Sequence, residues 1–119
     1  MTPDRLNRKD LNYPEELDAV VAAPESHKIL FENENLRVVE VVIPPGQKEP
    51  IHTHKWRSVM IVDKRADINY YDKDGKPTEI VRDENAKLPI VENMEPEGPH
   101  AVENIDSTEY HAIRVEFKK

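Results

Sequence analysis

The feature that most constrains the fold is a series of short segments with strand-like patterns, separated by turn residues at close intervals. The last of them, "EYHAIRVEFKK" at 109–119, alternates so that His111, Ile113, Val115 and Phe117 share one face. The earlier segments are "HKILFENENLRVVEVVIPPG" (two strands around a polar turn), "RSVMIVD", "ADINYYD" and "TEIVRD". Several short strands with little helical pattern among them predict an all-β sandwich or barrel.

Two glycines mark turns between these segments. Pro45-Gly46 suits the central positions of a type II turn, because glycine supplies the positive φ that the second position needs. Asp74-Gly75, within "DKDGK", predicts a primed hairpin turn. The pattern therefore predicts strands on both sides of each turn.

Residues 1–27 differ from the rest of the chain. "YPEELDAVVAAP" places Pro14 near a helix start and Pro24 at its end, with Leu17, Val20 and Val21 on one face. A short helix or docked arm is expected here, and a loosely ordered leader is the alternative. We therefore divide the chain into an arm at 1–27 and a barrel domain at 28–119. Since small barrels expose apolar faces and sheet edges, we expect the arm to pack on a second subunit in a homodimer.

Composition excludes several classes of function. The 119 residues suit one domain, and 17 Lys and Arg against 24 Asp and Glu give a net charge of -7, which argues against nucleic acid as a partner. The chain has no cysteine, so disulfides, cysteine-ligated zinc, iron–sulfur clusters and thiol nucleophiles are excluded. The polar start is unlike a signal peptide, and the apolar run "AVVAA" is too short to cross a bilayer. A cytoplasmic protein with no membrane partner is expected.

Two histidines follow the Pro-Pro-Gly turn. His52 and His54 are two residues apart, so on a strand their side chains project to the same side. If that side is the barrel interior, both imidazoles enter one pocket, and a third histidine from a distant strand would complete a site for a divalent metal. The alternative is a pair of polar residues on a solvated strand.

Two segments together resemble the paired motifs of the cupin superfamily. "GQKEPIHTH" at 46–54 has a glycine, five residues and His-x-His, and "PEGPHAVEN" at 96–104 has Pro-x-Gly, a histidine and then an asparagine. The similarity covers roughly residues 28–117 and implies a double-stranded β-helix (jelly-roll) barrel of the small single-domain kind. It also implies that His52, His54 and His100 are metal ligands that point into the barrel mouth.

The chain departs from the cupin pattern at the fourth ligand. The family's glutamate would fall at Ser58 or Val59, and the spacing between Gly98 and His100 is one residue shorter than usual. Three neutral imidazoles leave a divalent ion with its full charge and about three open positions, which favours an anionic, chelating ligand. Glu40, Glu92, Glu95 and Glu103 are other carboxylates that the fold could bring to the metal, although solvated strand faces are the simpler expectation for them.

The resemblance implies three alternative functions. The first is a metal-dependent, oxygenase-type enzyme that acts on a small anionic molecule, because three-His cupins include dioxygenases of thiols and diketones. It would hold one divalent ion, with iron expected first and manganese, nickel or zinc as alternatives. The second is a non-catalytic cupin that binds a small acid for sensing or storage, and the third is a scaffold whose barrel is filled with side chains.

Residues near the His-x-His pair are candidates for the pocket wall. Strand alternation continued from His52 and His54 places Trp56, Ser58 and Met60 on the same side. For Trp56, packing at the barrel rim or in a subunit contact is the alternative. Met60 is expected to be part of the core as well.

Three further residues are interpreted from their positions. Asn104 is expected to bond backbone groups near a strand end. His111 lies on the apolar face of the last segment, where it is either a core histidine or part of the pocket wall. His27 lies beside the arm and is expected at the surface.

Overall fold

The structure, a computed structural model, describes residues 13–118. Two short helical elements precede a series of strands. The elements are η1 (Glu15–Leu17), α2 (Ala19–Ala22), β1 (His27–Glu32), β2 (Leu36–Ile43), β3 (His52–His54), β4 (Ser58–Lys64), β5 (Ile68–Tyr71), β6 (Pro77–Ile80), β7 (Ile90–Met94), β8 (Glu97–Asn104) and β9 (Tyr110–Phe117). Neither helix in this part of the chain is long and apolar enough to span a membrane.

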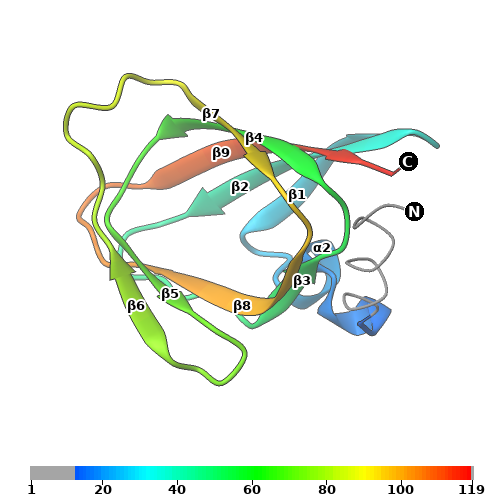
Figure 1. The fold of residues 1–119 in the computed structure, drawn as a ribbon, viewed down its shortest axis with the longest axis horizontal. Coiled ribbons are helices and arrows are strands. Elements are labelled where there is room, and N and C mark those ends of the chain that lie inside the picture. The colour runs from blue at the N-terminus through cyan, green and yellow to red at the C-terminus, as the bar shows by residue number, and fades with distance from the viewer. Residues whose placement is uncertain (1–12, 119) are drawn as a thin grey trace, which may run out of the picture.

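The strands form two antiparallel sheets that face each other (Figure 1). One sheet has the order β1-β2-β9-β4-β7 and the other the order β3-β8-β5-β6. The chain passes between them several times, so strands far apart in sequence, such as β2 and β9, become neighbours. The all-β, jelly-roll prediction is confirmed.

The core lies on the inner face of the five-stranded sheet. β2 alternates strictly between half-buried and buried residues, which fits its many β-branched side chains on a pleated surface. The buried apolar side chains that pack together are Val39, Val41, Ile43, Met60, Val62 and Ala112. Toward the other end of the same face, the inward residues Arg37, Arg114 and Glu116 are polar. His52, His54 and His100 belong to the four-stranded sheet.

The inward face of β9 is the opposite of the predicted one. Ala112, Arg114 and Glu116 are buried, whereas the apolar row that contains His111 lies on the outer side of the sheet. The prediction that His111 is a core or pocket residue is therefore wrong. Pairing decides the face, because Ile113 of that row pairs with Ile61 of β4, which also belongs to the outer, half-buried row.

His111 is instead held by two acids at the sheet surface. Its Nε2 lies 2.8 Å from Glu40 Oε2, and its Nδ1 contacts the Asp63 carboxylate. These two carboxylates raise the pKa of His111 above its ordinary value. Its role in the fold is a surface ion-pair cluster on the outer side of the sheet.

The segment before β1 docks on the barrel of its own chain, where α2 lies beside β3 (Figure 1). Asp18 forms an isolated bridge with Thr53, and its carboxylate accepts two hydrogen bonds from Arg37, at 3.0 and 3.2 Å. The helix buries Ala19, and Val20 packs against the core, whereas Val21 is 56% exposed. The predicted apolar face is therefore correct for Val20 and wrong for Val21. The part of the predicted arm at 1–12 lies outside the described residues.

The two predicted turns differ in outcome. Gly46 has a φ of 78° and Gln47 N donates to Pro44 O at 3.1 Å, as in a type II turn. The loop after β5 is longer than a two-residue primed turn, since Gly75 N donates to Asp72 O and Asp72 N donates to Lys76 O. A type I′ turn would need positive φ at Asp74 too, and among the described non-glycine residues none has it.

Candidate functional site

Three buried histidines meet where β3 pairs with β8. In the ladder, His52 lies opposite His100, and His54 lies opposite Glu97. The three side chains are nearly inaccessible, and their ring centroids lie 4.5 Å (His52 to His100), 5.0 Å (His52 to His54) and 5.2 Å (His54 to His100) apart. The antiparallel pairing thus brings His100 to His54 and His52, which lie 46 and 48 residues earlier in the chain.

His27 joins the same cluster from β1. Its ring centroid is 4.9 Å from that of His52 and 5.5 Å from that of His54, and it is only 5% exposed. The prediction that His27 lies at the surface is therefore wrong. No motif pointed to it, because His27 is the only buried residue of β1, so the strand shows no alternating pattern.

Backbone carbonyls determine the tautomers of two of these rings. His52 Nδ1 lies 2.8 Å from Pro50 O, and His100 Nδ1 lies 2.7 Å from Gly98 O. A carbonyl oxygen can only accept a hydrogen bond, so each Nδ1 carries the proton and donates it. In the neutral form of each ring, Nε2 then keeps a free lone pair, which is the state in which histidine binds a metal.

Burial keeps the imidazoles neutral. Desolvation lowers the pKa of His27 to about 4 and that of His52 to about 3, and it holds the pKa of His54 well below its ordinary value. The nearby Arg114 guanidinium lowers all three pKa values further. At neutral pH these rings are therefore uncharged donors of lone pairs.

Two glutamates lie at the edge of the histidine cluster. Glu49 Oε1 is 3.9 Å from His52 Nε2, and Glu97 Oε2 is 3.9 Å from His100 Nε2. Burial raises the pKa of Glu49 to about 7. Each glutamate precedes its histidine by three residues, in "EPIH" and "EGPH", and this repeated Glu-x-x-His is the sequence signal that could have identified both.

The donors fit a divalent transition metal. The ligand atoms of His27, His52 and His54 lie within 4.8 Å of one another, and so do those of His54, Glu97 and His100. Neutral imidazoles with a carboxylate are the usual ligands of iron, manganese, nickel and zinc in cysteine-free sites. His54 Nδ1 is buried without a hydrogen-bond partner among the described residues, and an ion would satisfy such an orphaned atom.

Ser58, one of the two positions where the family's glutamate would fall, is buried and contacts the site through Arg114. The Ser58 hydroxyl accepts a hydrogen bond from Arg114 Nη1 at 3.1 Å. Arg114 Nη2 lies 3.3 Å from Glu97 Oε1 and 3.5 Å from Met60 Sδ. A buried cation thus links Ser58 to the Glu97 carboxylate beside His100.

Trp56 lies outside the cavity, contrary to the alternation that placed it inside. Its ring is surrounded by cations, with Arg37 at 4.8 Å, Lys55 at 4.6 Å and Lys118 at 5.6 Å from the ring centroid. β3 ends at His54, and the chain crosses to the other sheet before β4 begins. Strand alternation cannot be continued through that crossing.

Asn104 closes the end of β8 by bonding the backbone. Its Nδ2 donates to Ile43 O and Thr108 O, both at 2.8 Å, and its Oδ1 accepts from Asp106 N at 2.8 Å. The side chain is completely buried. Its role is to hold the strand that carries His100.

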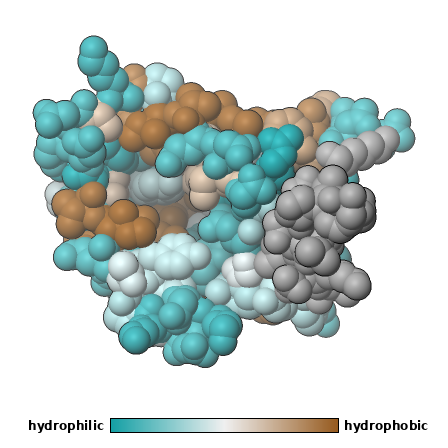
Figure 2. All heavy atoms as spheres, viewed as in Figure 1, coloured by the Kyte–Doolittle hydropathy of each residue, from teal (hydrophilic) through white to brown (hydrophobic). Residues whose placement is uncertain are grey.

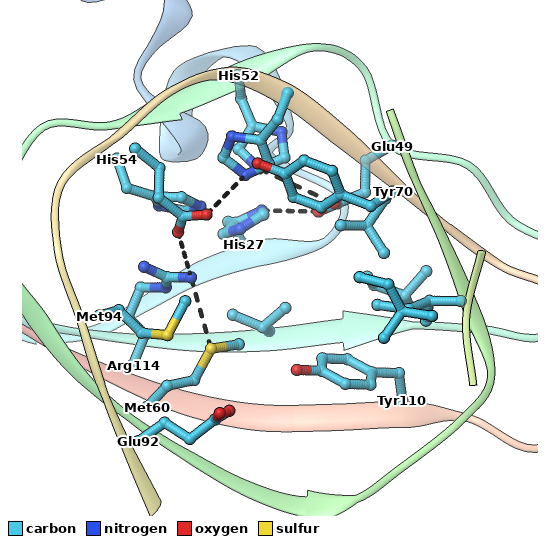
Figure 3. A pocket seen from close by; sticks show the side chains of 17 residues that line it. His27, Glu49, His52, His54, Met60, Tyr70, Glu92, Met94, Tyr110 and Arg114 are labelled. Carbon is cyan, nitrogen blue, oxygen red and sulfur yellow. Dashed lines mark hydrogen bonds and ion pairs between the residues drawn. The ribbon is translucent and has the colours of Figure 1, made fainter. Parts of the chain in front are cut away.

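The histidines form one wall of a cavity of about 310 Å³. Figure 3 shows Met60, Met94, Tyr110 and Glu92 across from the histidines, with Arg114 between them. Figure 2 shows that this face of the molecule is hollowed, with hydrophobic residues beside the hollow. The apolar lining residues are Val41, Ile43, Met60, Ile68, Ile80, Met94 and Val102. The interior is therefore not filled with side chains, which removes the support for a packed scaffold.

Two tyrosines complete the cavity. The Tyr70 ring stacks on the His100 ring, with centroids 5.3 Å apart and planes 6° from parallel. The Tyr110 ring extends into the interior (Figure 3). Burial raises the pKa of Tyr110 to about 12, so its hydroxyl stays protonated at neutral pH and can donate a hydrogen bond to a ligand.

Comparison with known proteins shows the fold and no closer relationship. No protein-family model and no curated protein sequence matches the chain. A cupin domain from Bordetella pertussis matches with a TM-score of 0.63 at 19% identity, covering 78% of this chain and 92% of that one. An RmlC-like cupin from Methanocaldococcus jannaschii matches with a TM-score of 0.56 at 18% identity, covering 76% of this chain and 77% of that one.

A third match is an enzyme by name. The polyketide cyclase RemF from Streptomyces resistomycificus matches with a TM-score of 0.56 at 17% identity, covering 94% of this chain and 77% of that one. At these identities the likeness concerns the fold. The chain thus has the double-stranded β-helix fold of the small cupins.

Proposed function

We propose that this protein is a metal-dependent small cupin that acts on a small anionic molecule. His52, His54 and His100 would hold one divalent transition metal, for which iron is the ion that we expect. The single observation that carries the proposal is the convergence of these buried imidazoles on one wall of an open cavity.

The charges in the cavity support a metal. Glu92 and Glu97 line it with Arg114, and Glu49, whose pKa is raised to about 7, adds a partial negative charge, so the carboxylates outnumber the cation among the described lining residues. An anionic ligand would be repelled by such a surface in the absence of a metal. A divalent ion reverses this balance and attracts the anion, which favours a metal-dependent enzyme over a metal-free acid-binding cupin.

Each part of the cavity has a distinct role under this proposal. The bound ion would act as a Lewis acid that polarises an oxygen or sulfur donor of the substrate. Arg114 would bind the anionic group, since its Nη2 already lies 3.3 Å from the Glu97 carboxylate. The Tyr110 hydroxyl would donate a hydrogen bond from the opposite wall.

The substrate is expected to have an apolar body. Methionine, valine and isoleucine side chains line the side of the cavity away from the histidines, and they would exclude water from around a bound molecule. RemF, whose name describes it as a polyketide cyclase, has the same fold. We therefore expect an oxygenase-type or related reaction on an organic acid, thiol or diketone.

Metal analysis tests the proposal. The purified protein should contain, or take up, one iron, manganese, nickel or zinc ion per chain, measured by plasma mass spectrometry. His52→Ala and His100→Ala should abolish this binding. The matched control, His111→Ala, removes a histidine of the outer face and should retain the metal.

Two outcomes would contradict the proposal. A native protein that binds none of these ions would favour an acid-binding cupin without metal chemistry. Metal binding that survives both alanine substitutions would place the ion elsewhere. Oxygen uptake measured with a panel of small thiols, diketones and carboxylic acids would then test the reaction class in the loaded protein.

A further inference from the structure

We propose that His27, which lies outside both cupin motifs, is a fourth protein ligand of the metal and that Ser26 and Glu49 orient it. This inference rests on the proposed metal site. It adds a ligand from β1, a strand that contributes nothing to the two motifs. Three observations carry it.

The first observation is the distance between the rings. A metal–nitrogen bond to imidazole is about 2.0–2.1 Å, so two imidazoles that share one ion have centroids roughly 4.5–5.5 Å apart. The His27 ring is 4.9 Å from His52 and 5.5 Å from His54, within the same range as the three predicted ligands. Moreover, the ligand atoms of these three residues lie within 4.8 Å of one another.

The second observation is the hydrogen bonding of Nδ1. The Ser26 hydroxyl has one proton, and it donates this proton to Glu49 Oε2 at 2.6 Å. The Ser26 oxygen, 2.9 Å from His27 Nδ1, can then only accept, and Ala23 O at 3.2 Å is a second acceptor. Both neighbours place the proton on Nδ1, so Nε2 keeps its lone pair, as in His52 and His100.

The third observation is the environment of the ring. His27 lines the cavity and is 5% exposed, and its Nδ1 lies 3.4 Å from Glu49 Oε2. A carboxylate behind a histidine is a common support for a metal ligand, because it fixes the ring and raises its basicity. A histidine kept for packing alone would not need this arrangement of Ser26, Glu49 and the Ala23 carbonyl.

The test counts the imidazoles on the ion. The native protein, His27→Gln and the control His111→Gln are loaded with Cu²⁺, and pulsed EPR measures the number of bound imidazoles. His27→Gln should show one imidazole fewer and an affinity that is at least about tenfold weaker in chelator competition. His111→Gln should match the native protein in both measurements.

A second pair of variants covers misfolding of His27→Gln. Ser26→Ala and Glu49→Gln keep the imidazole but remove its support, so they should weaken binding while leaving the imidazole count unchanged. If His27→Gln is folded by circular dichroism and keeps the native count and affinity, the inference is overturned. The same holds if both support variants bind as tightly as the native protein.

The outcomes also separate this inference from the proposed function. Loss of metal in His52→Ala and His100→Ala, together with an unchanged His27→Gln, would overturn the role of His27 alone. A native protein that binds no metal would overturn both.

Discussion

Asp18 anchors the N-terminal segment to the barrel, and its replacement by alanine should be strongly destabilising. Its carboxylate accepts hydrogen bonds from Arg37 Nη1 and Nη2 at 3.2 and 3.0 Å, and both side chains are 5% exposed. Removal of one partner of a buried ion pair costs about 3–5 kcal/mol, because the remaining charge loses its compensation. Arg37 retains Glu116 at 2.5 Å, so we expect a value near the lower limit, about 3 kcal/mol.

Urea unfolding followed by tryptophan fluorescence measures this loss. The chain has one tryptophan, and Trp56 lies 4.8 Å from the Arg37 guanidinium, so it reports directly on this region. Asp18→Ala should shift the midpoint to lower urea without a large change in slope. The backbone of Asp18 also bridges to Thr53, between His52 and His54, so loosening of the N-terminal segment in this variant should also weaken metal binding.

Glu15→Ala is the matched control for this experiment. Glu15 pairs with Lys55 at 2.7 Å, but its side chain is 75% exposed. Exposed ion pairs contribute about 1 kcal/mol or less, so this variant should resemble the native protein. If Asp18→Ala loses less than about 1 kcal/mol as well, the buried pair does not anchor the segment and our reasoning is refuted.

Three further predictions concern pH, the metal and assembly. In chelator-treated protein, the folded-state pKa values of His27 (about 4) and His52 (about 3) lie below their ordinary 6.5, so the unfolded chain binds more protons and stability falls as pH drops below 6.5. Protonation of each of these two histidines in the unfolded chain should lower the free energy of unfolding by about 2 kcal/mol at pH 5. Between pH 7 and pH 5, His27→Gln should therefore lose about 2 kcal/mol less stability than the native protein. Equal losses in urea unfolding would contradict this. Glu97→Gln should weaken metal binding about 10- to 100-fold in chelator competition. The control is Glu103→Gln, which should not weaken it, because the native Glu103 carboxylate accepts a hydrogen bond from the Tyr71 hydroxyl and lies in neither ligand group. Equal affinities of the two variants would exclude Glu97 from the site. Light scattering should give about twice the chain mass of 13.8 kDa. Ile29, Leu30 and Phe31 of the edge strand β1 are 41–55% exposed, and a second copy of the chain would cover them. A mass of one chain would contradict the expected dimer.

Local patterns in the sequence were sufficient for many of the strands and for much of the site, but they predicted neither β7 nor β8, where prolines interrupt the strand pattern. The polar turn at Asn33–Asn35 and the Pro45-Gly46 turn correctly separate neighbouring strands. The spacing of His52 and His54 predicts that they project to one side, and both are buried beside His100. These features depend on residues close in the chain, where alternation and turn chemistry act directly. Metal ligation by the three histidines stays a prediction.

Features that depend on the pairing of distant strands were beyond local patterns. Alternation in β9 separates its two faces, but only its pairing with β2 and β4 shows that Arg114 and Glu116 point inward and His111 outward. The bend between β3 and β4 takes Trp56 out of the cavity in the same way.

The sequence by itself therefore determined the all-β fold and the histidines of the two motifs, because strand periodicity and turn preferences are properties of neighbouring residues. Only the tertiary structure decided that His27 joins them and that Arg114 and Glu116 of β9 point inward. The physical reason is that burial and ion pairing depend on which strands meet across the barrel, and no short segment contains that information.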